Sequence, residues 1–201
     1  MKKLILASAS PRRAELLRQV GIPFNLVIPE ICEQVSEQLT PEELVSTLAR
    51  KKAESVVATV DRGLVLAADT LVYYRGLILG KPGDAEEAGR MLQLISGARH
   101  EVITALHLVD AESGRIESGI SSTKVWMKEL TALEIAAYLA TGEPYDKAGA
   151  YGIQGRAALF ISRIEGCYFN VVGLPLSLLQ ELLNNMNFTT WLNGDDLGDA
   201  K

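Results

Sequence analysis

Short apolar runs alternate with amphipathic segments of helical length in the first third of the chain. The runs at 4–7, 24–28 and 64–68 have the length and continuous hydrophobicity of buried strands. Between them, apolar residues spaced three and four apart predict helices over 11–20 and 41–60, each with a proline at its first position. This alternation is typical of an α/β protein.

In the remainder of the chain, several neighbouring strands are predicted to be joined by short turns. Arg75 and Gly76, for example, separate two apolar runs in the manner of a β-hairpin. In order, we expect a hairpin over 70–79, a helix over 84–95, strands over 100–109 and 116–127, a helix over 131–140, a hairpin over 159–172 and a helix over 175–186. Because hairpins place antiparallel strands side by side, the predicted fold class is α/β with a mixed central sheet flanked by helices.

Composition limits the number of domains and the kind of partner. The 201 residues are 48% hydrophobic and 22% charged, which is ordinary for one globular domain. We expect this domain, in two lobes, over 1–186 and a flexible acidic tail over 187–201, where periodicity is lost. A net charge of -5 and 6% aromatic residues argue against a nucleic-acid-binding surface, although a local basic pocket stays possible.

Neither a membrane segment nor a zinc site is expected. The apolar stretch near the N-terminus is too short for a signal peptide, and no apolar run approaches the length of a membrane span. Two distant cysteines and two histidines do not form a zinc-binding pattern. We therefore predict a cytoplasmic protein with free thiols and no membrane partner.

The first candidate site lies at 8–13, where a strand passes into a helix. Ser8, Ser10, Arg12 and Arg13 place hydroxyl and guanidinium groups at a helix N-terminus, which favours an anion such as phosphate. At about 100° per residue, Arg13 falls inside the apolar arc of its helix and should point towards the interior. A buried arginine there needs an anionic partner, either an internal carboxylate or a ligand; the alternative is a capped helix with exposed arginines.

Three further residues carry charge at restrained positions. Lys52 falls in the apolar arc of its helix, Asp69 directly follows a buried strand, and Lys81 lies between a glycine and a proline. Together with Arg13, the two lysines suggest a converging positive pocket, while Asp69 could hold a divalent metal or act as a general base. Each also has a structural interpretation: a lysine that reaches solvent, a turn cap and an exposed turn residue.

A glycine-rich segment over 142–155 completes the candidates. An irregular segment of this kind inside a compact domain usually shapes a site, although it is also compatible with a long surface loop. Gln154, within it, offers both a donor and an acceptor suited to the edge of a nucleobase. Glu33 lies in a polar connection and is marked only by being a carboxylate without basic neighbours.

Taken together, these segments resemble the Maf family of nucleoside triphosphate pyrophosphatases. The resemblance runs from the N-terminus to about Asn184, in the order of the family's motifs. The matching pieces are SASPRR at 8–13, Glu33, LARKKA at 48–53, AADT at 67–70, GKP at 80–82, SGARHEVITAL at 96–106, GEPYDKAGAYGIQG at 142–155 and VVGLPL at 171–176.

The resemblance implies a fold, a reaction and a substrate class. The fold would have two lobes with a cleft between them, similar to that of inosine triphosphate pyrophosphatases. The reaction would be hydrolysis of a nucleoside triphosphate to the monophosphate and pyrophosphate with a divalent metal cation, Mg²⁺ or Mn²⁺. Arg12, Thr70 and Gln154 match the type that acts on dTTP and UTP, and differ from the type that acts on 7-methyl-GTP.

Residue roles follow from the same resemblance. Asp69 would be the proton acceptor, and Glu33 with Asp69 would hold the metal or position water. The substrate-binding residues would be Ser8, Arg12, Arg13, Lys52, Thr70, Lys81 and Gln154. The resemblance also suggests a homodimer, and an alternative role as a nucleotide-binding regulator of cell division or septum formation that acts through a partner.

Overall fold

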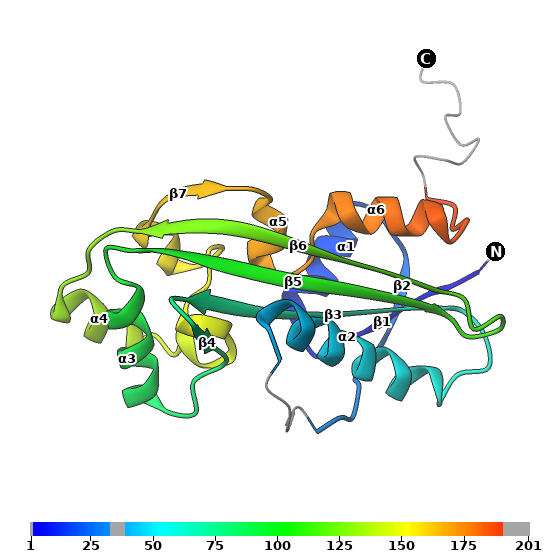
Figure 1. Ribbon diagram of the computed structural model, residues 1–201, viewed down its shortest axis with the longest axis horizontal. Helices are drawn as coiled ribbons and strands as arrows, with labels where there is room; N and C mark the ends of the chain where they lie inside the picture. The colour runs from blue at the N-terminus through cyan, green and yellow to red at the C-terminus, as the bar shows by residue number, and fades with distance from the viewer. Residues whose placement is uncertain (1, 33–38, 191–201) are drawn as a thin grey trace, which may run out of the picture.

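The computed structural model describes residues 2–32 and 39–190, and these form one seven-stranded sheet with helices on both faces (Figure 1). The predicted mixed α/β fold is therefore confirmed. The elements in chain order are β1 Leu4–Ala7, α1 Pro11–Gln19, β2 Phe24–Val27, α2 Pro41–Val57, β3 Leu64–Tyr74, β4 Leu77–Leu79, α3 Ala85–Ile95, β5 Arg99–Asp110, β6 Ile116–Met127, α4 Ala132–Leu139, the 3-10 turns η1 Glu143–Asp146, η2 Ala148–Ala150 and η3 Arg156–Phe160, β7 Ile161–Glu165, α5 Tyr168–Val172 and α6 Leu176–Asn185.

The sheet combines parallel and antiparallel pairs. Its order is β2-β1-β3-β5-β6-β7, and the short strand β4 pairs with β3. Strand β1 runs parallel to both β2 and β3, whereas the pairs β3–β4, β3–β5, β5–β6 and β6–β7 are antiparallel. The long strands β3, β5 and β6 extend through most of the molecule and connect its two ends (Figure 1).

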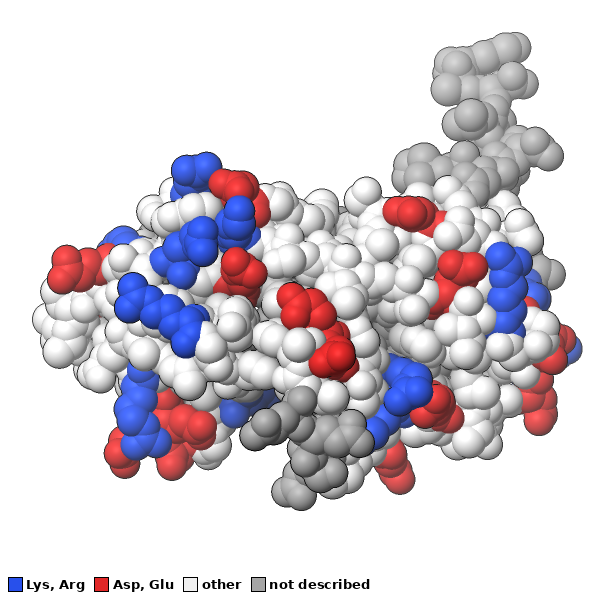
Figure 2. All heavy atoms as spheres, in the orientation of Figure 1, with Lys and Arg blue, Asp and Glu red and all other residues white. Residues whose placement is uncertain are grey.

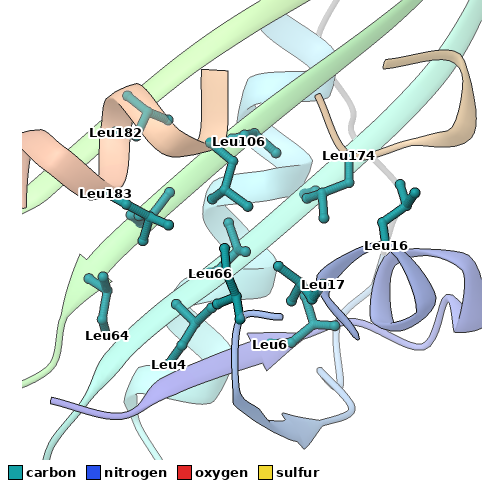
Figure 3. Close-up of a cluster of buried hydrophobic side chains, with 14 of the residues drawn as sticks. Leu4, Leu6, Leu16, Leu17, Leu64, Leu66, Leu106, Leu174, Leu182 and Leu183 are labelled. Carbon is teal, nitrogen blue, oxygen red and sulfur yellow. The ribbon is translucent and has the colours of Figure 1, made fainter. Parts of the chain in front are cut away.

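Alternation along the strands creates two hydrophobic layers. On one face, leucines of β1, β3 and β5 pack against α1 and α6 (Figure 3). On the other face, Ile5, Val65 and Ala67 pack against α2, whose Ala53 is completely buried. Period-two alternation therefore sends neighbouring residues of β3 into different layers.

One predicted strand boundary and one predicted strand are wrong. Strand β3 does not end at Ala68 but continues through Asp69 to Tyr74, because β5 pairs with it along this whole length. The segment over 168–172 is the short helix α5, not the second strand of a hairpin. Its Asn170 is buried and donates to the carbonyl of Val102 at 2.8 Å; an apolar run this short cannot be assigned by periodicity alone.

Charged side chains of both signs lie interspersed on the face shown in Figure 2. No helix in the described part of the chain is both long enough and apolar enough to cross a membrane.

At the C-terminal end, Phe188 packs into the core with 6% of its surface exposed, so ordered packing extends into the segment predicted as a tail. Residues 191–201 of that segment lie outside the described residues.

Candidate active site

The candidate site forms at a gap along one edge of β3. Strand β5 pairs with β3 from Leu64 to Tyr73 on one edge. On the opposite edge, β1 pairs only as far as Ala67, and β4 pairs only from Val72 onwards. Among the described residues, 68–71 therefore have no strand neighbour on this edge, and the carbonyl groups there need other donors.

Helix α1 begins at this gap, directly after β1 ends. Ser10 is at the N-cap, but its side chain makes no capping hydrogen bond. Instead, the Ser8 hydroxyl accepts from the Ser10 amide at 3.1 Å. No side chain caps the helix, and residues 8–13 line the cleft at this gap, so the positive end of α1 favours an anion there.

Arg13 points inward, as the helical pattern predicted, and fills part of the gap. Its guanidinium donates to the carbonyls of Ala68 and Gly173, each at 2.8 Å. It also donates to the hydroxyls of Ser8 at 3.3 Å and Thr70 at 3.1 Å. Arg13 is only 8% exposed, so these contacts join β1, β3 and the end of α5 in a buried network. Its predicted role in binding a triphosphate stays a prediction.

The hydrogen bonds around Thr70 have a defined direction. Thr104 donates to the carbonyl of Asn170 at 3.1 Å, so its hydroxyl proton is committed. In the 2.9 Å contact between Thr70 and Thr104, Thr70 must then be the donor. Since Thr70 also accepts from Arg13, its hydroxyl can offer a ligand only a remaining acceptor position.

Lys52 and Asp69 face each other across the boundary between α2 and the sheet. The Lys52 ammonium lies 2.5 Å from Asp69 Oδ1, and the two side chains are 13% and 11% exposed. Ala49 and Ala53 on α2 are completely buried, which brings this helix close to the sheet. Lys52 thus stabilises negative charge on Asp69, which lines the cleft in the middle of β3.

A second group of charges lies at the mouth of the gap. Arg12 donates to Asp146 at 3.1 Å, and Lys147 donates to the same carboxylate at 2.6 Å. Partial burial by itself would raise the pKa of Asp146, but Lys147 and Arg12 outweigh it and lower that pKa below its ordinary value. Asp146 therefore holds two cations at the cleft as an ionised carboxylate.

Other predicted residues complete the lining. Lys81 and Gln154 are exposed and line the cleft. Tyr151 also lines the cleft, and its hydroxyl lies 2.7 Å from Nε2 of His100, a buried residue whose pKa is lowered by burial to about 4. His100 is therefore neutral near pH 7 and adds no charge behind Tyr151.

The resulting cleft has a volume of about 380 Å³. It contains all eight of the predicted site residues that the structure describes, namely Ser8, Arg12, Arg13, Lys52, Asp69, Thr70, Lys81 and Gln154. Five basic and two acidic residues line it, giving a local excess of positive charge in a chain of net charge -5. Glu33, the remaining predicted residue, lies outside the described residues.

Sequence reasoning missed several residues that shape this cleft. Asp146 and Lys147 lie inside the glycine-rich segment, so a closer examination of its charges could have found them. Thr104 had no local signal, because its place opposite Thr70 depends on the register of β3 and β5. Glu143 and Tyr138 were also missed, and neither of them lines the cleft.

The described side chains would bind a divalent metal only together with substrate phosphates and water. Within 2–32 and 39–190, no three His, Cys, Asp or Glu side chains form a metal-binding group. Mg²⁺, however, is commonly held by one or two carboxylates together with substrate phosphates and water. The Asp69 carboxylate, in a cleft rich in cations, fits that kind of site.

The fold and the cleft define an α/β protein with a cationic site suited to a small polyanion. The chain belongs to the family of Maf-like proteins, whose model matches residues 3–186. It is 50% identical over 186 residues to a dTTP/UTP pyrophosphatase of Carboxydothermus hydrogenoformans, covering 92% of this chain and 100% of the relative. It is also 50% identical over 191 residues to a dTTP/UTP pyrophosphatase of Moorella thermoacetica, covering 95% and 98%.

Among solved structures, the Ham1 protein of Staphylococcus aureus is similar to this chain with a TM-score of 0.49. The two sequences are 14% identical, and the match covers 92% of this chain and 100% of that one. A HAM1 protein from Coxiella burnetii matches with a TM-score of 0.48 at 18% identity and the same coverage.

Proposed function

We propose that this protein hydrolyses dTTP and UTP to the nucleoside monophosphate and pyrophosphate. The observation that carries the proposal is the gathering of eight predicted residues, from segments far apart in the sequence, in one cationic cleft. The names of relatives that share about half of their residues with this chain support the same substrates.

The triphosphate would lie against the start of α1. Its oxygens would accept a hydrogen bond from the Ser8 hydroxyl, and the positive charges of Lys81, Lys52 and Arg12 would stabilise them. Water attacks the α-phosphorus, the bond from that phosphorus to the bridging oxygen breaks, and pyrophosphate leaves with the electron pair. Fixed cations around the departing group stabilise the charge that develops there.

Asp69 is the residue proposed to take the proton of the attacking water. Lys52 orients its carboxylate through one oxygen, Oδ1. A divalent cation held by Asp69, and by Glu33 as the resemblance implies, would supply further charge neutralisation and lower the pKa of bound water. The described residues fit this arrangement because the phosphates themselves provide most of the remaining ligands.

Base recognition is assigned to Gln154, with Thr70 and Arg12 beside it. We expect Gln154→Glu to change the ratio of kcat/KM for UTP over GTP by about tenfold, because the carboxylate has no donor to offer the base. Steady-state kinetics with both nucleotides measures this ratio. Gln180→Glu, on α6 and away from the cleft, is the matched control. An unchanged ratio in Gln154→Glu would show that Gln154 does not contact the base.

The primary test is pyrophosphate release from dTTP, UTP, CTP, GTP and 7-methyl-GTP with Mg²⁺ or Mn²⁺. Turnover of dTTP and UTP above the others supports the proposal. In water labelled with oxygen-18, the label must appear in the monophosphate, because attack occurs at the α-phosphorus. Label in pyrophosphate, or nucleotide binding without turnover, would overturn the proposed reaction; the latter would favour the regulatory role.

Further features follow from the family resemblance and belong to the same proposal. We expect a homodimer in the cytoplasm with two lobes around the cleft. The two lobes would correspond to the hydrophobic clusters on either side of the gap, one built on α1 and α6 and the other on α3 and α4. Size-exclusion chromatography with light scattering measures the oligomeric state directly.

A further inference from the structure

The turn that carries Gln154 is held at both of its ends. The turn closes on itself through a hydrogen bond from the Gly155 amide to the Gly152 carbonyl at 3.0 Å. At its start, the Gly152 amide donates to the hydroxyl of Tyr138 at 3.3 Å. At its end, the Arg156 amide donates to Glu143 Oε2 at 3.0 Å.

These two attachments meet in a single carboxylate. The Tyr138 hydroxyl donates to Glu143 Oε1 at 2.9 Å, so Tyr138 gives its proton to Glu143 and accepts from Gly152. Glu143 thus uses one oxygen for Tyr138 on α4 and the other for the backbone beyond the turn. Burial and the neighbouring Glu143 raise the pKa of Tyr138, which keeps its hydroxyl protonated as a donor near pH 7.

Close packing shows how tightly the turn fits against this carboxylate. A Cβ atom at Gly155 would lie 2.1 Å from Glu143 Oε1, and one at Gly152 would lie 2.6 Å from Cε of Lys147. Lys147 in turn donates to the Glu143 carbonyl at 2.6 Å. A side chain at either position would therefore force the carboxylate of Glu143 or the end of Lys147 to move away from the turn.

We propose that Glu143 is a positioning residue for base recognition: through Tyr138 and the Arg156 amide, it fixes the backbone from which Gln154 reaches into the cleft. The inference rests on the proposed function, because it assumes that Gln154 contacts the base. Glu143 does not itself line the cleft. Its effect on catalysis must therefore be transmitted through the turn.

Glu143→Gln tests the inference with almost no change in volume. The two oxygens of Glu143 each accept one hydrogen bond, whereas glutamine has one acceptor and one donor group. Glutamine can therefore accept from only one of the two donors, and the other hydrogen bond is broken or reversed; both lose the charge of the carboxylate. We expect KM for UTP and dTTP to rise about tenfold while kcat changes less than about twofold. The inhibition constant of tripolyphosphate, which has no base, should stay unchanged.

Glu134→Gln is the matched control. Glu134 also accepts from a backbone amide, that of Thr131, and lies on α4, the helix of Tyr138, but it caps that helix and does not touch the turn. It should lower stability to a similar extent without raising KM. A fall in kcat with unchanged KM in Glu143→Gln, or a parallel change in the tripolyphosphate constant, would overturn the inference.

Two further variants keep the inference testable. Tyr138→Phe removes the attachment at Gly152 and should raise KM in the same direction, even if Glu143→Gln does not fold. In a Gln154→Ala background, Glu143→Gln should add little further effect, because both act through one side chain; an additive effect would contradict this.

If the wild-type protein turns over neither UTP nor dTTP, the proposed function fails, and UTP dissociation constants of the same variants test the inference separately.

Discussion

Replacing Asp69 by asparagine is expected to lower kcat for dTTP and UTP by about a thousandfold. Asparagine has nearly the same shape, and its carbonyl oxygen can still accept the hydrogen bond from Lys52, which lies 2.5 Å from Asp69 Oδ1. What it loses is the negative charge, and with it the ability to take a proton from water or to hold a cation. The chemical step should therefore suffer far more than the fold.

The measurement compares kcat with the free energy of unfolding in urea. Asp84→Asn is the matched control, because Asp84 caps α3 by accepting from the Glu87 amide and asparagine caps helices nearly as well. Both variants should show the far-ultraviolet circular dichroism of the wild-type protein. Wild-type turnover in Asp69→Asn would remove Asp69 from the role of base.

Replacing Arg13 by methionine is expected to lower the free energy of unfolding by about 3 kcal/mol. Methionine fills much of the same volume but has no donors, so the carbonyls of Ala68 and Gly173 lose their 2.8 Å hydrogen bonds. The Ala68 carbonyl faces the gap in the sheet edge, where β1 and β4 provide no strand neighbour. The cost should therefore appear as a loss of stability, whether or not Arg13 also binds phosphate.

Arg12 provides the comparison. Its side chain is 23% exposed and pairs with that of Asp146, which is 59% exposed, so Arg12→Met should change the free energy of unfolding by about 1 kcal/mol or less. Urea denaturation of both variants measures the difference. Equal effects of the two substitutions would mean that the Arg13 network does not stabilise the sheet edge.

Several features of the molecule were predictable from local sequence. The capping boxes at Thr40 and Thr131, and the cap at Asp84, form because a hydroxyl or carboxylate three residues before a helical amide can accept from it. The inward direction of Arg13 and Lys52 followed from helical periodicity, since both lie among apolar neighbours on their helices. The candidate site residues came from motif resemblance, and the eight described ones share one cleft.

The sequence by itself thus determined the helices, most of the strands, the inward-facing cations and the chemical character of the site. Only the tertiary structure decided that β3 continues through Asp69 and leaves one edge open between β1 and β4. It alone shows that Asp69 pairs with Lys52, that Thr70 accepts from Arg13, and that Glu143 binds the backbone beyond the turn of Gln154. The physical reason is that hydrogen-bond partners across a sheet or between segments depend on strand order and register, which local periodicity does not encode.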